Sequence, residues 1–248
     1  MKITLVIPCY NEELNIQKGV LDKIGNYTKN NQYFTEVLIV DDGSSDQSRN
    51  IIKDKYLKTF PQFRLVENSH KGKAFAVITG IEKAHEEYVM FSDMDLATPI
   101  EEAQNLIEEA KKGYNVVIGS RSGRREGAPL LRKTMAFAAI LIQGIIIGLH
   151  GIKDTQCGFK LFEKNAALSI IKKLRVFHNN RKIEGSSVSA GFDMEFLFVA
   201  TKLKLKIKET PVDWKHVETK HVNFLKDSFE GLKDILLIKY YDLKHRYD

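Results

Sequence analysis

Cysteine is scarce in this sequence, and glycine and proline stay far below the levels of repetitive proteins. The two cysteines, Cys9 and Cys157, lie far apart, so a disulfide framework is excluded and a reducing, cytosolic compartment is expected. With 16 glycines and 5 prolines, collagen-like and mucin-like repeats are excluded as well. A hydrophobic content of 43% over 248 residues excludes disorder and indicates one globular domain with a substantial core.

A hydrophobic run long enough to span a membrane is also missing. The longest nearly apolar stretch, Met135–Leu149, is interrupted by a glutamine and two glycines and falls short of the roughly 20 residues that a spanning helix needs. The residues Met1–Pro8 form too short an apolar run for a signal peptide and predict a strand. The sequence therefore predicts no integral membrane segment, and contact with a membrane surface stays open.

Several common signatures of catalytic sites are absent. No Gly-x-Gly-x-x-Gly follows the first predicted strand, and no Gly-x-x-x-x-Gly-Lys-Ser/Thr occurs, which argues against dinucleotide oxidoreductases and P-loop NTPases. There is no Cys-x-x-Cys, no His-x-x-x-His and no Gly-x-Ser-x-Gly, and the seven histidines are scattered. A zinc site and an α/β-hydrolase nucleophile are therefore not expected.

The charge balance is mildly basic, with 38 Lys and Arg against 32 Asp and Glu and a net charge of +6. Such a balance fits a phosphate-bearing small ligand or an anionic membrane surface as well as it fits nucleic acid. An ordinary soluble surface accounts for it equally well.

Short strands alternate with helices in the first half of the chain. Helical spacing of apolar residues separates the strands, and a helix is expected to open at Thr98, with Thr98 as N-cap and Pro99 at the first helical position. This alternation predicts a doubly wound, mostly parallel α/β sheet. The predicted strands are Ile3–Ile7, Val37–Val40, Arg64–Val66, Tyr88–Phe91 and Val116–Ile118.

The second half has a different pattern. A basic loop over 121–133 precedes an apolar helix at 134–149, and a polar segment follows at 154–162. A Ser- and Gly-rich loop spans 178–191, and an amphipathic helix is expected at 224–241, with Leu225, Phe229, Leu232 and Leu236 along one side. With no linker and no repeat, the best division is a single domain, 1–248, with one half at 1–121 and a second at 122–248.

Polar residues gather directly after four of the predicted strands. In an open parallel sheet, ligands bind beyond the carboxyl ends of the strands, so these clusters are expected to share one edge. Any single cluster could be turn or cap chemistry, but four together favour a binding site. The clusters are Pro8–Glu13, Asp41–Asp46, Ser92–Asp95 and Gly119–Arg121.

Asp93 and Asp95 are the most specific of these candidates. Two carboxylates one residue apart after a buried strand suit Mg²⁺ or Mn²⁺, which takes one or two carboxylates together with phosphate oxygens and water. The alternative is that the aspartates start a helix, but Thr98 is expected to supply that cap.

The motifs together resemble family 2 glycosyltransferases. That resemblance rests on Val6–Glu13, Val40–Asp46, Asp93–Asp95 and Gly119–Arg121. More narrowly, the segments Asp93–Pro99, Asp154–Phe162 and Pro211–Trp214 are similar to the dolichyl- or polyprenyl-phosphate β-glucosyltransferases. The resemblance covers nearly the whole chain. It implies a GT-A-like nucleotide-sugar fold and inverting transfer of a hexose, with glucose favoured, from a nucleoside diphosphate sugar, with UDP-glucose favoured, to a polyprenyl or dolichyl phosphate.

The resemblance also implies a role for individual residues. On the nucleotide side it places Pro8, Tyr10, Glu12 and Asp42 around the base and ribose, with the Asp42 carboxylate accepting a hydrogen bond from the base. It assigns the sugar and the metal-bound diphosphate to Asp93 and Asp95, and it makes Lys73 a nucleotide-facing lysine, although a surface lysine is nearly as good an interpretation.

Arg121 and Arg132 match arginines that meet the donor and acceptor phosphates, and Gln156 and Lys160 would line the acceptor side. Asp193 and Glu195 match a position near the acceptor; helix capping and an exposed helix face are the alternatives.

Two departures narrow the family. The polymerising branches carry Gln-x-x-Arg-Trp, whereas the single tryptophan here is Trp214 in Val-Asp-Trp-Lys. Ala97 stands where the mannosyl-phosphate branch often has glutamine, which favours glucose weakly. A mannosyl or other acceptor specificity, a nucleotidyltransferase and a non-catalytic nucleotide-sugar module stay open as alternatives.

The lipid acceptor requires an apolar surface for its tail. The predicted helices 134–149 and 224–241 combine apolar faces with basic flanks, a pattern typical of helices in a membrane interface, although buried core helices would fit too. We therefore expect a cytoplasmic, peripheral protein at the inner face of a membrane, with Mg²⁺ or Mn²⁺ as cofactor and no nucleic acid partner.

Overall fold

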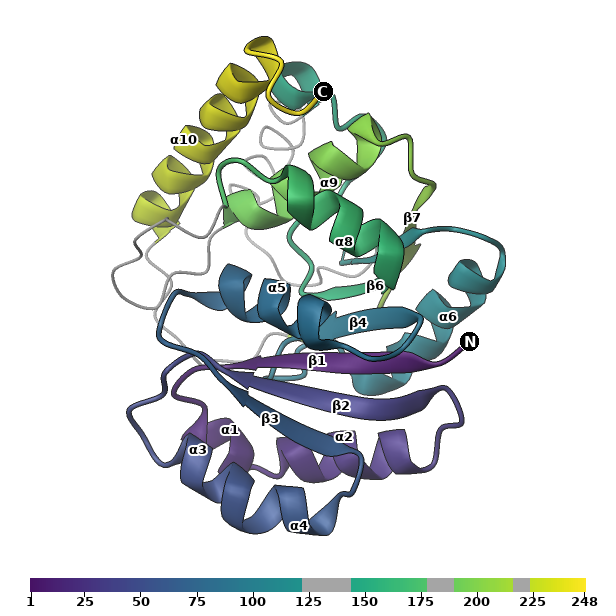
Figure 1. The fold of residues 1–248 in the computed structure, drawn as a ribbon, viewed down its shortest axis with the longest axis vertical. Coiled ribbons are helices and arrows are strands. Elements are labelled where there is room, and N and C mark those ends of the chain that lie inside the picture. Colours follow the sequence, from purple (N-terminus) through teal and green to yellow (C-terminus); the bar gives the residue numbers. More distant parts are fainter. Residues whose placement is uncertain (122–143, 178–189, 216–223) are drawn as a thin grey trace.

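The computed structural model describes residues 1–121, 144–177, 190–215 and 224–248, and a seven-stranded sheet runs through them (Figure 1). The strand order is β3-β2-β1-β4-β6-β5-β7. The antiparallel strand β6 pairs with β4 and β5, and the other pairs are parallel. The strands are β1 (Ile3–Cys9), β2 (Phe34–Asp41), β3 (Phe63–Glu67), β4 (Tyr88–Ser92), β5 (Val116–Ser120), β6 (Phe159–Glu163) and β7 (Ile207–Pro211).

All five predicted strands are confirmed, and their burial explains why the sequence reveals them. Every residue of β1 is buried, and in β2 only Thr35 is exposed. Strands covered on both faces read as continuous apolar runs rather than as alternating ones. The prediction of a doubly wound, mostly parallel sheet is therefore confirmed.

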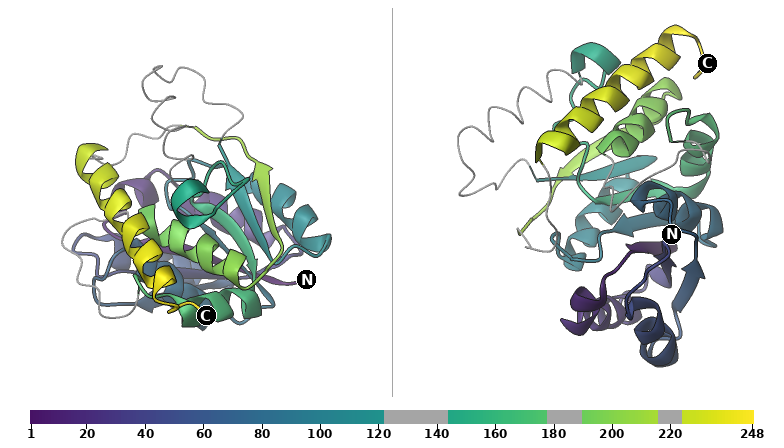
Figure 2. Two further views of the ribbon diagram at one scale, coloured as in Figure 1. Left: turned by 90° about the horizontal axis from the view of Figure 1, so that it is seen from above. Right: turned by 90° about the vertical axis from the view of Figure 1, so that its left-hand side faces the viewer.

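Helices cover both faces of the sheet. One face packs against α1 (Glu13–Gln17), α2 (Val20–Lys29), the helical stretch from α3 (Ser48–Ile51) to α4 (Leu57–Thr59), and α6 (Ala103–Lys111). The other face packs against α5 (Lys73–Lys83), α8 (Lys164–Lys173), α9 (Ala190–Lys202) and α10 (Phe224–Leu243). The helix α10 runs along α9 on the outside of this layer (Figures 1 and 2).

The two halves of the chain share the one sheet. Strand β6, from the second half, inserts between β4 and β5 of the first half, and β7 extends the sheet beyond β5. The segment before β6 is therefore held against the carboxyl end of β4. This insertion brings the polar segment 154–162 to the edge where the predicted site lies.

The predicted start of the helix after β4 is wrong in detail. Pro99 has an extended backbone (ψ 140°), a 3₁₀ turn covers Ile100–Glu102, and α6 begins at Ala103 without a side-chain cap. Thr98 is buried rather than serving as the N-cap. The 3₁₀ turn takes over the start of the helix, which frees Thr98 to line the site described below.

Much of the predicted apolar helix at 134–149 lies outside the described residues. Residues 144–147 are helical, with Ile147 and Leu149 buried in the core and Ile145 exposed. The helix predicted at 224–241 is confirmed as α10 and extends to Leu243. Among the described helices, none combines the length and the apolar character needed to cross a membrane.

Candidate active site

The polar ends of β1, β2, β4 and β5 lie at one edge of the sheet, as the sequence predicts. These strands run in the same direction, because β6 is antiparallel to both β4 and β5. From β1 the chain continues to β2 and β3 on one side, and it returns to β4 on the other. Such a switch point opens a crevice beyond the strand ends, where ligands bind in doubly wound folds.

On one side of the crevice, Asp42 ties two loops together. Its side chain is almost fully buried, and its carboxylate accepts hydrogen bonds from the backbone N–H groups of Lys71 (2.9 Å) and Gly72 (2.7 Å). It also lies 2.8 Å from Nδ1 of His70. Gly43, at φ +77°, permits this approach, since a Cβ there would lie 2.9 Å from the backbone nitrogen of His70. The carboxylate predicted to meet a nucleobase thus organises the loop before α5.

Tyr10 joins the same cluster through His70. The two rings stack with centroids 4.2 Å apart and planes at 16°. His70 therefore links Tyr10, after β1, to Asp42, after β2. The sequence analysis did not single out His70, because nothing in the Lys- and Gly-containing loop around it marks it as an aromatic partner.

The other two residues predicted for the nucleotide side belong to β1 and its loop. Pro8 is buried within β1 opposite Val40 of β2. The backbone N–H of Glu12 donates to Ser48 Oγ (2.8 Å), and its carboxylate accepts from Asn15 (2.6 Å). The first contact fixes the loop after β1 against the start of α3, and the second fixes it to α1. Contacts of Pro8 and Glu12 with a nucleotide stay predictions.

An acidic cluster lies beyond β4. Lys73, the first residue of α5, forms an ion pair with Asp93, and Oδ1 of Asp95 accepts the Ala97 N–H (3.0 Å). Burial, reinforced by the charge of Asp93, raises the pKa of Asp95 above its ordinary value. Burial alone would lower the pKa of Lys73, but the charges of Asp93, Asp193 and Asp95 raise it overall. Lys73 is thus a member of the site rather than a solvated surface lysine.

The chemistry of this cluster fits a divalent cation that shares its ligands with a substrate. The described residues contain no group of three or more His, Cys, Asp or Glu side chains that could hold a metal by themselves. Two carboxylates suffice, however, for Mg²⁺ or Mn²⁺ that completes its shell with phosphate oxygens and water. A cation would also offset the burial, and the neighbouring charge of Asp93, that raise the pKa of Asp95.

The buried Lys160 forms an ion pair with the partly buried Asp193. Lys160 is 1% exposed, and its Nζ donates to Oδ1 of Asp193 (2.5 Å) and to the Cys157 carbonyl (2.6 Å). Asp193 lies near the start of α9, and Cys157 lies just before β6. The lysine predicted to line the acceptor side therefore holds the Asp193 carboxylate in place.

Arg121, at the end of β5, is held by Asp154. Its backbone N–H (2.8 Å), Nε (2.7 Å) and Nη2 (2.7 Å) all donate to the Asp154 carboxylate. Burial alone would lower the pKa of Arg121, but the hydrogen bonds and charge of Asp154 raise it above its ordinary value. Asp154 is anchored in turn, because its N–H donates to Glu209 of β7 (2.9 Å). The guanidinium is therefore fixed in orientation.

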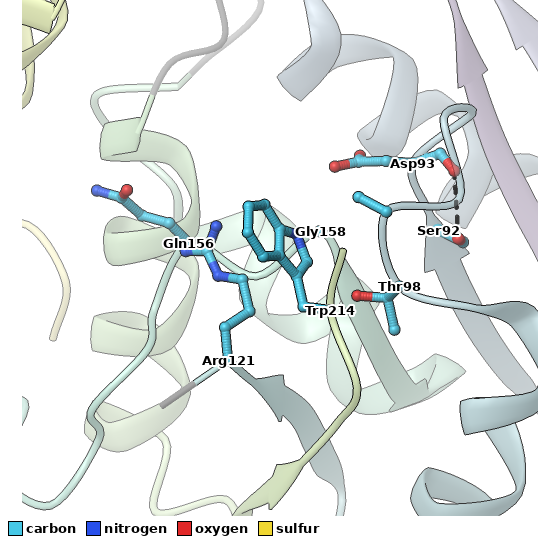
Figure 3. A pocket seen from close by; sticks show the side chains of 8 residues that line it. Ser92, Asp93, Thr98, Arg121, Gln156, Gly158 and Trp214 are labelled. Atoms are coloured by element: carbon cyan, nitrogen blue, oxygen red, sulfur yellow. Dashed lines mark hydrogen bonds between the residues drawn. The ribbon is translucent and has the colours of Figure 1, made fainter. Parts of the chain in front are cut away.

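A cleft brings the predicted residues Asp93, Arg121 and Gln156 together (Figure 3). Gly158 allows Asp93 to point into it, since a Cβ at this position would overlap the Asp93 carboxylate. Trp214 and Thr98 line it as well, and the sequence analysis gave neither of them a place in the site. The full lining is Ser92, Asp93, Ala97, Thr98, Arg121, Gln156, Gly158 and Trp214.

Two further candidates differ in what the structure says of them. Glu195 is fully buried, and it accepts hydrogen bonds from the backbone that follows α8 and from Tyr247. An exposed helix face for Glu195 is therefore wrong. Arg132, predicted to meet a phosphate, lies outside the described residues, and so do the neighbouring basic residues Arg124, Arg125 and Lys133.

The sequence matches a known protein family over most of its length. The sequence model of the family described as "Glycosyl transferase family 2" matches residues 4–180. A dolichyl-phosphate β-glucosyltransferase of Trichomonas vaginalis is 33% identical over 230 residues, covering 87% of this chain and 66% of that protein. The dolichyl-phosphate β-glucosyltransferase of Saccharomyces cerevisiae is 30% identical over 258 residues, covering 96% of this chain and 74% of that protein. The chain thus spans about two thirds to three quarters of the length of these relatives.

Solved structures share the fold. Glucosyl-3-phosphoglycerate synthase from Mycobacterium tuberculosis, in complex with Mn²⁺ and uridine-diphosphate-glucose, aligns with a TM-score of 0.68 at 18% identity. That alignment covers 96% of this chain and 78% of the synthase. Mannosyl-3-phosphoglycerate synthase from Rubrobacter xylanophilus aligns with a TM-score of 0.68 at 12% identity, covering 99% of this chain and 75% of that one. These likenesses establish a glycosyltransferase fold of the GT-A type.

Proposed function

The chain belongs to glycosyl transferase family 2, and from this premise we propose that it transfers glucose from UDP-glucose to the phosphate of a polyprenyl or dolichyl phosphate, with inversion at the anomeric carbon. The observation that carries the proposal is the convergence of Asp93, Arg121 and Gln156 on one cleft beyond the carboxyl ends of β4 and β5. The names of the dolichyl-phosphate β-glucosyltransferase relatives support the acceptor class and the sugar.

The nucleotide lies, in this proposal, against the cluster of Tyr10, His70 and Asp42. The aromatic pair offers a stacking surface for a base, and Asp42 holds that pair in place through His70. The diphosphate then extends toward Lys73 and the acidic cluster. The nucleoside and the diphosphate of one donor are thereby bound by residues that follow β1, β2 and β4.

The reaction breaks the bond between the anomeric carbon and the diphosphate and forms a bond from an acceptor phosphate oxygen to that carbon. A phosphate monoester has a second pKa near ~6, so the acceptor is already largely ionised at neutral pH. It needs no strong general base, which agrees with the lack of a Ser-His pair among the residues that line the cleft. Attack opposite the leaving group inverts the anomeric centre.

Negative charge grows on the departing nucleoside diphosphate, and the site must stabilise it. Asp93 and Asp95 would hold Mg²⁺ or Mn²⁺, which, when bound, supplies positive charge to the leaving diphosphate. Lys73 adds a cation next to Asp93, and Arg121 presents a guanidinium fixed by Asp154. Groups fixed before the reaction stabilise such charge without reorganising.

The lipid tail of the acceptor implies a membrane surface, and α10 offers one. Four of its apolar side chains are exposed at helical spacing, namely Leu232 (42%), Leu236 (54%), Tyr240 (54%) and Leu243 (67%). The exposed or half-buried lysines Lys233, Lys239 and Lys244 flank this row. An apolar row with basic flanks supports peripheral binding to an anionic membrane, here proposed at its cytoplasmic face. The buried free thiols of Cys9 and Cys157 agree with a reducing compartment.

A transfer assay tests the proposal. The purified chain is incubated with Mg²⁺ or Mn²⁺, a polyprenyl phosphate and a panel of UDP- and GDP-sugars, and the lipid product is separated and identified. The expected result is glucosyl phosphoryl lipid from UDP-glucose with release of UDP. A parallel incubation supplies UTP and glucose 1-phosphate. Synthesis of UDP-glucose there, without lipid product in the first incubation, would overturn the proposal in favour of a nucleotidyltransferase. Donor binding without any turnover would indicate a binding module.

A further inference from the structure

The segment after β7, residues Val212–Lys215, borders the cleft and is here called the strap. At one end, the Val212 N–H donates to the Ser120 carbonyl at the end of β5 (3.0 Å). At the other end, the Lys215 N–H donates to the Ala97 carbonyl in the turn that follows Asp95 (2.8 Å). The strap is therefore fixed to both sides of the site.

Trp214 lies between these two anchors and lines the cleft. The Arg121 guanidinium carbon lies 5.8 Å from the centre of the indole, and Asp93 and Thr98 lie across the cleft from it (Figure 3). The indole is half-buried in a lining that is otherwise mainly polar or small. Because its ring is large and apolar with one polar edge, tryptophan suits a ligand that has both an apolar face and hydroxyl groups.

We propose that Trp214 is the residue on which the transferred hexose stacks, and that it makes the site prefer glucose. The inference rests on the proposed function, because the hexose must lie between Asp93 and the acceptor phosphate near Arg121. That is the place which the indole borders. In glucose the hydroxyls at C2, C3 and C4 are all equatorial. The axial C–H groups therefore present uninterrupted apolar faces to an aromatic ring. In galactose the axial 4-hydroxyl interrupts one of these faces, and it is on this face that the proposal places the indole.

A structural role alone makes a different prediction. If Trp214 served only to pack the strap against Arg121, its loss would lower the melting temperature and reduce the binding of all donors alike. A stacking role acts on the hexose and leaves the nucleotide untouched. The ratio of the dissociation constant of UDP-glucose to that of UDP therefore separates the two roles.

The test compares W214F, which keeps an aromatic ring, with W214L, which keeps an apolar side chain of lower stacking power. Lys215→Ala serves as the matched control, since Lys215 is exposed and its anchor to Ala97 uses the backbone. Calorimetric titrations use UDP, UDP-glucose and UDP-galactose in the presence of Mg²⁺. In W214L the UDP-glucose to UDP ratio should rise about tenfold, while W214F and the control stay near the parent. The preference for UDP-glucose over UDP-galactose should fall in parallel.

Unchanged ratios in W214L would overturn the inference, and so would equal losses for UDP and UDP-glucose. Thermal unfolding of each variant shows whether the fold persists; if W214L unfolds, W214M, which also lacks an aromatic ring, replaces it in the comparison with W214F. Failure of the proposed function has a separate signature. In that case the parent protein makes no glucosyl lipid, whatever the binding ratios of the variants.

Discussion

Tyr247 donates its hydroxyl to Oε1 of Glu195 over 2.7 Å, which ties the residues after α10 to the middle of α9. The same carboxylate accepts the backbone N–H groups of Arg175 (2.6 Å), Val176 (2.8 Å) and Phe177 (2.9 Å), just after α8. Glu195 is fully buried. Four donors on one buried carboxylate satisfy its charge, and they join three helices of the layer that carries Asp193.

Glu195→Gln should therefore destabilise the protein strongly. The amide would turn an N–H₂ group toward backbone donors, leaving buried groups without acceptors, at a cost of about 2–4 kcal/mol in the free energy of unfolding. Tyr247→Phe removes one hydrogen bond and should cost about 1–2 kcal/mol. Urea unfolding measures both, with Ser169→Ala on the exposed side of α8 as control. Equal stability of Glu195→Gln and the control would contradict the structural role.

Acid should unfold the protein in part through Glu36. Burial alone would raise the pKa of this carboxyl, but hydrogen bonds from Thr4 (2.6 Å), the His85 N–H (3.1 Å) and Arg64 lower it below its ordinary value of 4.5. A carboxyl with a lowered pKa in the folded state stabilises the protein above its unfolded-state value. That stability is lost as the pH falls below about 4.5 and through the folded-state pKa.

Glu36→Gln removes this titration. The variant should be less stable at neutral pH by about 1–3 kcal/mol, and its stability should fall less steeply between about pH 5 and pH 3. Glu108→Gln, an exposed position on α6 with the same change of charge, is the control. Urea unfolding across this range gives the slopes. Parallel curves for the parent and Glu36→Gln would show that another group governs the acid response.

The parts of the fold that the sequence predicts are those whose burial has a local signature. The strands β1, β2 and β4 are apolar runs, and the clusters at their ends follow from the geometry of a parallel sheet. Strand β6 escaped prediction because Lys160, its second residue, breaks the apolar run. The buried lysine is tolerated because its Nζ donates to the Cys157 carbonyl and to the distant Asp193. In β7 the residues are only partly buried, so their alternation is weak.

In the candidate site, too, the sequence predicts only residues that belong to a local pattern. Asp93, Arg121 and Gln156 could be named because their motifs are contiguous, and the cleft brings them together. His70 and Trp214 could not, because each acquires its place through partners far along the chain. The ring of His70 lies on Tyr10, sixty residues earlier by number, and the strap of Trp214 is bonded to Ala97 and Ser120. Contacts of such long range leave no pattern in a single sequence.

Gly158→Ala should damage the site more than the fold. The new Cβ would overlap the Asp93 carboxylate, and a side chain of this kind gives way by rotating out of the cleft. Asp93 would then leave Lys73 and the proposed metal site, so the transfer rate should drop by about tenfold or more while the melting temperature changes little. Gly144→Ala is the control, because its nearest neighbour would be His150 at 3.4 Å. Full activity of Gly158→Ala would show that the position of Asp93 is not critical.

Asp95→Asn should abolish transfer while keeping the turn. Asparagine retains an oxygen that accepts the Ala97 N–H, whereas Asp95→Ala loses that bond too. Both variants should lower the rate by about two orders of magnitude or more, since a group that holds charge near the leaving diphosphate is gone. Only the alanine variant should also lose about 1 kcal/mol of stability. Transfer rates measured across a Mn²⁺ titration test the metal role, and circular dichroism checks that each variant is folded. Activity of Asp95→Asn near that of the parent would exclude a metal role.

The exposed row on α10 should govern binding to membranes. Leu236 and Tyr240 are each 54% exposed, and Leu14, on α1 at the far side of the sheet, is 72% exposed. A double change of Leu236 and Tyr240 to glutamine removes apolar area that a lipid interface would bury, so vesicle affinity should fall about tenfold or more. Leu14→Gln makes a similar change of surface polarity on the other face and should leave affinity unchanged.

Sedimentation with vesicles that contain phosphatidylserine measures this affinity, and added salt separates the contributions. The lysines that flank the row should make binding weaker as salt rises, because each contributes about 1 kcal/mol near an anionic surface and is screened beyond the Debye length. The apolar contribution persists at high salt, and it is this part that the double variant should lose. Transfer to a long-chain polyprenyl phosphate should fall together with binding, whereas transfer to a short, water-soluble acceptor should not. If the double variant and Leu14→Gln bind vesicles alike, α10 is not the membrane-facing surface.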